Sequence, residues 1–279
     1  MAATSGFSVT FWGVRGSIAC PGPDMLRYGG NTSCLEVRCG DALLIFDAGT
    51  GLRPLGQKLA KAGGRIDADI FFSHTHFDHV GGLPFFGPAF LADNRFRFWS
   101  GHLKAQGLDL CGVLCEMMMP PLFPVPIEIL KADIAYRDFT AGETLTPRPG
   151  VTLKTAPLNH PNGATGYRIE YAGKSICYVT DTEHTGAGPD RTICGLIAGA
   201  DLVIYDSTYT DEEFPRFRGW GHSTWQEGVR ICEAAGAKRL VVFHHDPSHD
   251  DPVMDEIARA AEQRRPGTIV AREGVTLEP

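Results

Sequence analysis

The chain has 279 residues and a formal net charge of −7 at pH 7. A protein that acts on long polyanions is usually basic, so this charge argues against long nucleic acid as the substrate, though not against a small phosphate compound. Charge or proline interrupts every apolar run before it reaches the length of a membrane span, so we expect no membrane partner. The hydrophobic content of 43% is ordinary for a globular protein and allows a sizeable core.

The cysteines and the N-terminus indicate the cellular compartment. Residues 1–6 lack a basic region and a long apolar segment, so we expect no signal peptide. The eight cysteines form no C-x-x-C pair, and several lie in apolar runs such as Ile176–Val179. We interpret them as reduced, buried, small hydrophobic residues of a cytoplasmic protein, and not as a structural zinc site.

The first half of the chain is predicted to begin with strands and to continue with helices. A hairpin turns at Gly40-Asp41, and Gly63-Gly64 ends the first helix. The predicted strands are 7–12, 34–38, 42–46, 70–72 and 95–99, and the predicted helices are 52–62, the end of 83–91 and 103–119.

The second half is richer in strands. The predicted strands are 135–139, 151–157, 166–171, 175–180, 202–207, 240–244, 268–271 and a short terminal strand, and the predicted helices are 191–198, 225–235 and 253–264. Thr224 and Glu227 form a capping-box pattern, and Asp251-Pro252 predicts an N-cap followed by proline in the first turn. No linker long enough to separate the halves is present, so we predict one domain over residues 1–279.

A dense group of histidines follows the apolar strand at 70–72. The loop contains His74, His76, Asp78 and His79, and imidazole and carboxylate are the ligands that borderline divalent metals prefer. Side chains at i and i+2 of an extended chain point the same way, so His74 and His76 can share one ion. Asp78 and His79 lie past a turn and can face a second ion. The alternative, a solvated loop at a strand end, would make this density an accident.

His-Thr-His-Phe-Asp-His resembles the H-x-H-x-D-H signature of the metallo-β-lactamase superfamily. The resemblance implies an α/β fold, a four-layer αββα sandwich of the metallo-β-lactamase type, with one or two metals at one edge of the paired sheets. Later candidates follow predicted strands in matching order, namely His160, Asp181 and one of the pair His244 and His245. An ordinary loop polar group is the alternative for each of them.

The ligand set is carried over from this resemblance. It implies a first metal on His74, His76 and His160, a second metal on Asp78, His79 and His244, and a bridging carboxylate at Asp181. We choose His244 because Asp246-Pro247 resembles the endings of related hydrolases, in which the ligand lies two residues before the aspartate. His245 stays an alternative. Two divalent ions are therefore expected, with Zn placed before Mn or Fe for this nitrogen and oxygen donor set.

Three further residues carry less specific signals. Gly221-His222-Ser223-Thr224 resembles the His-Ser-Thr element of the ribonuclease Z branch and its phosphodiesterase relatives, in which a histidine outside the metal shell donates a proton to the leaving oxygen. Asp206 can orient His222, and an exposed loop histidine is the alternative. Asp47, in an Asp-x-Gly context, resembles the aspartate behind the metals, and an ordinary turn aspartate is an equal alternative.

The resemblance implies a dinuclear metal-dependent hydrolase. We predict a phosphodiesterase for a small or cyclic nucleotide-like diester, with His222, Asp78 and Asp206 as catalytic residues and a metal-bridging hydroxide as the nucleophile. The sequence has no long basic arm of the ribonuclease Z kind, which argues against tRNA. Hydrolysis of a carboxylic ester, thioester or lactone is the alternative, with Tyr209 as a weak lactonase-type candidate. A metal-binding module without catalysis is a further alternative.

The stretch 117–124, Met-Met-Met-Pro-Pro-Leu-Phe-Pro, is open to three interpretations. Methionine adapts to varied shapes, so the stretch can be a mobile lid over the site. It can also belong to the core or form a homodimer contact. We favour core or homodimer contact, because most apolar residues serve packing.

Overall fold

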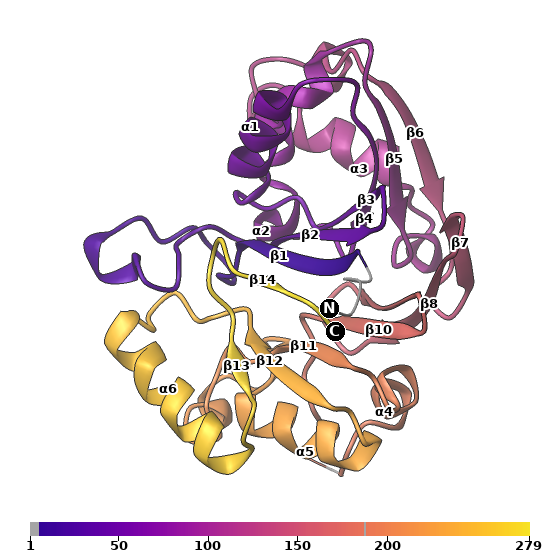
Figure 1. The fold of residues 1–279 in the computed structure, drawn as a ribbon. Coiled ribbons are helices and arrows are strands. Elements are labelled where there is room, and N and C mark those ends of the chain that lie inside the picture. The colour runs from indigo at the N-terminus through magenta and orange to yellow at the C-terminus, as the bar shows by residue number, and fades with distance from the viewer. Residues whose placement is uncertain (1–5, 187) are drawn as a thin grey trace.

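Two seven-stranded sheets pack face to face, and helices cover both outer faces (Figure 1). The computed structural model describes residues 6–186 and 188–279. The first sheet runs in the order β14 (Thr276–Leu277), β1 (Phe7–Gly13), β2 (Cys34–Cys39), β3 (Ala42–Phe46), β4 (Asp67–Phe72), β5 (Arg95–Ser100), β6 (Asp133–Asp138). The second sheet runs in the order β13 (Ile269–Val270), β12 (Arg239–Phe243), β11 (Leu202–Asp206), β10 (Lys174–Val179), β9 (Ala164–Tyr171), β8 (Val151–Leu158), β7 (Thr144–Arg148).

The helices divide between the outer faces of the two sheets. Those of the first half are α1 (Leu52–Ala62), α2 (Phe77–Val80) and α3 (Leu110–Met117), and those of the second half are α4 (Arg191–Ile197), α5 (Trp225–Ala235) and α6 (Asp251–Arg264). In Figure 1 the indigo to magenta half lies above the orange to yellow half, and β14 returns from the C-terminal end to pair with β1. The predicted α/β four-layer sandwich is confirmed.

Alternation along the strands builds three apolar clusters. In a strand, successive side chains point to opposite faces, so one face of each sheet meets the other sheet and the second face meets helices. Phe46 and Phe71 stack between the sheets, with ring centroids 5.2 Å apart. Ile45 and Ile70, one residue earlier on the same strands, pack instead in the cluster that contains α1 residues such as Leu55.

The direction of the strands decides where the site forms. Strands β3 to β6 are mutually parallel, and so are β10 to β13. The carboxyl ends of parallel strands share one edge of a sheet, where ligand sites typically lie. The loops that follow β3, β4, β10, β11 and β12 therefore meet at one edge of the sandwich.

Some predicted elements differ from the structure. The helix predicted at 103–119 begins only at Leu110, because Gly107 adopts a left-handed φ of 72° and Asp109 caps the new start by accepting the Gly112 amide at 2.9 Å. Strand β7 was not predicted, since it contains Pro147, which an edge strand tolerates. The region 83–91 forms two short 3-10 turns.

The start of α6 also differs from the prediction. Asp250, and not Asp251, caps the helix by accepting the Val253 amide at 3.0 Å. Asp251 is buried and instead accepts the backbone amide of Arg27 at 2.8 Å. The carboxylate of Asp251 is thus used in the long-range contact with residues 27–28, and Asp250 serves as the N-cap.

The methionine-rich stretch is split between core and surface. Met118 is fully buried among α3 and the first sheet, whereas Met119 is 49% exposed and Leu122 is 81% exposed. The core interpretation thus applies to Met118. Over the described residues, no helix combines the length and the apolar character that crossing a bilayer requires.

Candidate metal centre

Three histidines from two loops converge at the edge of the sandwich. His74 and His76 follow β4, and His160 follows β8. His160 Nε2 lies 3.0 Å from His76 Nδ1, and the ring centroids of His74 and His160 are 4.7 Å apart. The candidate ligand atoms of all three lie within 4.8 Å of one another. A single cation can therefore contact the whole group.

A second group lies beside the first. Asp78, His79, Asp181 and His244 also bring their ligand atoms within 4.8 Å of one another, and all four are buried. His79 Nε2 is 3.2 Å from Asp78 Oδ2 and 3.2 Å from Asp181 Oδ1. His244 Nε2 is 3.3 Å from each of the same two oxygens. This group can hold a second cation.

The choice between the last two histidines is visible in their surroundings. His245 points away from the group, and its Nε2 donates to the Ala271 carbonyl at 2.9 Å. Burial lowers the pKa of His245 to about 3, so it stays neutral in the interior. His244 is the member of the pair that reaches the carboxylates.

Asp181 joins the two groups. Its Oδ2 lies 3.6 Å from His74 Nε2 and 3.7 Å from His160 Nε2, whereas its Oδ1 faces His79 and His244. One carboxylate oxygen is thus directed at each group. This is the arrangement that a carboxylate bridging two cations requires, because its negative charge reduces their mutual repulsion.

The donor chemistry fits divalent metals. One nitrogen of each of four imidazoles is held by the protein, which directs the other nitrogen into the site. The contacts are His74 Nδ1 to Ser73 Oγ (3.1 Å), His79 Nδ1 to Asp47 Oδ2 (2.8 Å), His160 Nδ1 to the Gly221 carbonyl (2.7 Å) and His244 Nδ1 to Thr208 Oγ1 (3.0 Å). His74 Nε2 is buried and has no hydrogen-bond partner within residues 6–186 and 188–279.

The protonation states of His74 and Asp181 favour the same conclusion. Burial and the neighbouring histidines hold the pKa of His74 well below its usual value, so its ring is neutral and its lone pair is free. Burial opposes ionisation of Asp181, but the surrounding histidines outweigh it and hold the pKa of that carboxyl well below its usual value. Neutral imidazole and ionised carboxylate are the forms that bind metal.

Asp47 supports the second group from behind. It is fully buried, and its carboxylate accepts His79 Nδ1–H at 2.8 Å, the Ser73 amide at 2.7 Å and the Tyr178 hydroxyl at 2.7 Å. The structure therefore favours the interpretation as a supporting aspartate over an ordinary turn residue. No feature of the sequence indicated the contact with Tyr178, because the two residues lie on different sheets.

Replacing Asp47 with asparagine is expected to weaken metal binding by about 10–100-fold, the usual effect of losing a partner of a ligating histidine. The amide NH₂ would face donors that now meet an oxygen, so the free energy of unfolding should also fall by about 1–3 kcal/mol. Zinc competition titration and thermal unfolding measure the two effects. Tyr178→Phe is the control, because it removes one of the donors and leaves the carboxylate. Unchanged zinc affinity in Asp47→Asn would contradict the assignment.

Backbone strain concentrates in this region. Asp47, Asp181 and His244 have φ values of 60°, 54° and 63°, and each follows the end of a strand closely. Such left-handed conformations are uncommon for residues other than glycine and occur often at functional sites. The turn after each strand thereby directs its side chain into the edge of the sandwich.

His222 lies between the two groups. Its ring centroid is 5.2 Å from that of His160 and 5.0 Å from that of His244. It is only 8% exposed, so it is not a solvated loop histidine. Its Nδ1 donates to Asp206 Oδ2 at 3.1 Å. Burial opposes its protonation, but Asp206 and Asp181 outweigh this effect and raise the pKa of His222 to about 9.

Two supporting contacts were not predicted. The backbone amide of Ser17 donates to Asp78 Oδ2 at 2.7 Å, from the turn after β1. The Glu183 carboxylate accepts the Gly219 and Gly221 amides at 2.8 and 2.9 Å, and so fixes the loop that precedes His222. The first contact uses the backbone amide of Ser17, which any residue other than proline could supply, and the second joins distant loops. Neither therefore leaves a pattern in the sequence.

The surface around the site includes two hollows. One of about 220 Å³ is lined by His74, His76, Gln106 and Asn162, and a larger apolar one of about 520 Å³ is lined by Phe77, Phe85, Met117, Leu122 and Phe123. Tyr209 is buried, and its ring stacks on Phe217 with centroids 4.5 Å apart.

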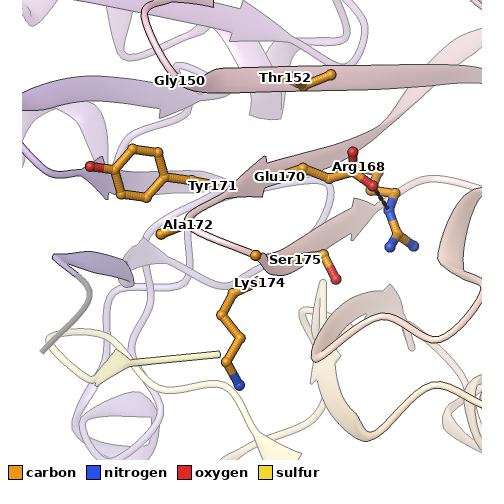
Figure 2. Close-up of a pocket in the computed structure, with 9 residues that line it drawn as sticks. Gly150, Thr152, Arg168, Glu170, Tyr171, Ala172, Lys174 and Ser175 are labelled. Atoms are coloured by element: carbon orange, nitrogen blue, oxygen red, sulfur yellow. Dashed lines mark hydrogen bonds and ion pairs between the residues drawn. The ribbon is translucent and has the colours of Figure 1, made fainter. Parts of the chain in front are cut away.

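A further hollow of about 360 Å³ lies away from this centre, around the hairpin of β9 and β10 (Figure 2). It sits at the start of β10, whereas Asp181 follows its end. Its charged side chains already have partners, since Arg168 donates to Glu170 at 2.7 Å and Lys174 reaches Asp201 at 3.3 Å. We assign it no function.

Comparisons with known proteins agree with this geometry. The beta-lactamase superfamily domain family matches residues 43–245. A ribonuclease Z from Gemmatimonas aurantiaca is 36% identical over 277 residues, which cover 84% of this chain and 86% of that protein. The zinc-bound PqqB structure from Methylobacterium extorquens has a TM-score of 0.73 at 18% identity and covers 98% and 100% of the two chains. The human short-form tRNase Z has a TM-score of 0.68 at 20% identity, with coverage of 97% and 98%.

One expectation is corrected by these relatives. The net charge argued against long nucleic acid as a substrate, yet the relative with 36% identity is named ribonuclease Z and matches most of the chain. The physical reason is that net charge averages over the whole surface. Binding of a phosphate strand depends on the local electrostatic field at the binding site, which can be favourable even when the net charge of the protein is negative.

Proposed function

Because the chain belongs to the metallo-β-lactamase superfamily, we propose that it is a dinuclear metal-dependent phosphodiesterase acting on nucleotide diesters. The predicted enzyme class, a metal-dependent hydrolase of phosphoric diesters, is confirmed by the relatives named ribonuclease Z. The observation that carries the finer proposal is Asp181, whose two oxygens face two separate groups of ligands, with His222 beside it.

The proposed ligands form two sets, which correspond to the two groups of side chains described above. His74, His76 and His160 would hold one ion, Asp78, His79 and His244 the other, and Asp181 both. Divalent ions bound there, zinc in our proposal, would withdraw charge from a phosphoryl group and make water a nucleophile near neutral pH. Since residues from both halves of the chain contribute, we propose that residues 1–279 act as one domain.

The proton donor is proposed from the pairing of His222 with Asp206. Because Nδ1–H of His222 donates to the Asp206 carboxylate, Nε2 is the atom that can deliver a proton to the departing oxygen. Asp206 is itself held, since it accepts the Thr182 amide at 3.0 Å and the Thr208 hydroxyl at 2.8 Å. It can therefore keep the imidazole in one orientation.

The substrate is proposed to be a diester between nucleosides, in an RNA strand or in a small or cyclic nucleotide. Both present the same phosphoryl group to the site. A cytoplasmic location is part of the proposal and is supported by the eight cysteines, which are free thiols. A carboxylic ester or lactone is the second candidate, favoured by the same ligands, because the same nucleophile attacks a carbonyl.

The first test is hydrolysis of bis(p-nitrophenyl) phosphate by purified protein loaded with zinc or manganese, with chelated protein as control. We expect turnover that depends on the metal. Protein that holds its metals but hydrolyses only p-nitrophenyl acetate or a lactone would contradict the phosphodiesterase assignment and favour the second candidate.

Replacing His222 with alanine is expected to reduce hydrolysis of a diester with an alkoxide leaving group by roughly 100- to 10,000-fold, because proton donation to that oxygen is lost. The loss should be smaller for p-nitrophenolate, which departs without a proton. Steady-state rates on both substrates measure the difference, and metal analysis checks that the ligands remain occupied. Equal losses on both substrates would exclude a role as proton donor.

A further inference from the structure

The segment Phe214–Trp220, just before His222, alternates aromatic rings with arginines. Its sequence is Phe-Pro-Arg-Phe-Arg-Gly-Trp. Trp220 is 63% exposed, and Arg216 and Arg218 are also exposed. We call Arg216, Arg218 and Trp220 the rim platform. Exposure of a tryptophan beside two cations is unusual for a purely structural loop, since large aromatic residues are mostly buried.

The base beneath the rim platform is fixed. Phe217 stacks on Tyr209 with the ring planes 7° apart, and Phe214 stacks on His184 with centroids 4.1 Å apart. The Gly219 amide donates to Glu183 at 2.8 Å. The loop is therefore held from below, and little ordering is needed when a ligand binds to its outer side.

The two arginines of the rim platform are available for a ligand. Arg216 lies over the ring of Phe217 at 5.6 Å, and Arg218 lies over the ring of Phe214 at 5.7 Å. Neither forms an ion pair with a carboxylate in the part of the chain that the structure describes. Arg230, on the adjacent α5, differs because it pairs with both Asp211 and Glu227. Unlike Arg230, the two guanidinium groups of the rim platform therefore have no carboxylate partner among the described residues.

We propose that the rim platform binds a single-stranded nucleotide segment on the leaving-group side of the site. Guanidinium groups bind phosphates, and an exposed indole stacks on any nucleobase, which together recognise a single strand. Trp220 precedes His222 by two residues, so their Cα atoms are at most about 7–8 Å apart. The inference rests on the proposed function, because His222 defines the leaving-group side only if it donates the proton.

The test measures binding directly. Fluorescence anisotropy of a labelled single-stranded phosphorothioate RNA, with metal-loaded protein and over a range of salt concentrations, gives the affinity and its salt dependence. Trp220→Ala should weaken binding by about ten-fold, the scale of one lost base stack, and Trp220→Phe should restore part of it. Arg216→Gln with Arg218→Gln should reduce the slope of log K against log salt by about 1.4, or 0.7 for each phosphate contact.

The control is Arg65→Gln, an exposed arginine before the start of β4, whereas the ligands follow the end of that strand. It should change neither affinity nor slope. Unchanged affinity in Trp220→Ala, or an unchanged slope in the double arginine variant, would overturn the inference. Equal binding of a polyglutamate peptide would also overturn it, because that peptide has no base to stack. Absence of bis(p-nitrophenyl) phosphate turnover by the metal-loaded wild type would instead reject the proposed function. The anisotropy data would still show whether the rim platform binds the RNA.

Discussion

Replacing Asp181 with asparagine is expected to lower both the metal content and the turnover of this protein. The carboxylate faces both histidine groups, with contacts of 3.2 to 3.7 Å to His79 and His160 among others. The amide keeps the shape but loses the charge that would hold two cations together. We expect the metal content to fall below two ions per chain. Turnover should fall by more than the roughly 10–100-fold expected when a residue that only hydrogen-bonds a ligating histidine is lost.

Metal analysis after dialysis and bis(p-nitrophenyl) phosphate turnover measure the two effects. Asp201→Asn is the matched control, because Asp201 is also a buried carboxylate but lies before the start of β11, at the opposite end from the ligands. It should lower stability through its contacts with Lys174 and Lys238 and leave metal content unchanged. Full metal occupancy in Asp181→Asn would refute a bridging role.

Replacing Gly221 with alanine is expected to disrupt the first group of proposed ligands, although none of those ligands is itself replaced. Gly221 has a φ of +88°, and a Cβ built there would lie 2.3 Å from His160 Nδ1 and 2.3 Å from Pro161 Cδ. The Gly221 carbonyl also accepts the Nδ1–H of His160 at 2.7 Å. His160 must therefore move. We expect a loss of about 1–3 kcal/mol in the free energy of unfolding from strain, together with loss of metal and of most turnover.

The variant Gly219→Ala distinguishes the effect of backbone strain from the effect of the steric clash with His160. Gly219 has the same φ of +88° and donates its amide to the same Glu183 carboxylate, but a Cβ there meets no atom within 4 Å. It should show the conformational strain and keep its metals. Thermal unfolding and metal analysis of both variants provide the comparison. Equal metal contents in the two variants would show that the contact with His160 does not matter.

Much of the fold could be read from local patterns. The helix 52–62 and the helix 225–235 have the predicted limits, because glycine ends both and Thr224 caps the second by accepting the Glu227 amide. Residues 103–119 were harder, since the apolar periodicity continued through a segment that Gly107 interrupts. Strand β7 was missed because proline inside a strand is acceptable only at a sheet edge, and the edge is a property of the assembled sheet.

The types of the proposed ligands, and the loop that carries four of them, could be read from the chain alone, because residues 74–79 contain three histidines and one aspartate directly after an apolar strand. The residues that support these proposed ligands become visible only in the folded chain. Tyr178 reaches Asp47 across the two sheets, Ser17 binds Asp78 through its amide, and Glu183 holds the loop before His222. These contacts join segments far apart in the chain, and they depend on backbone direction and strand order, which residue types alone do not specify.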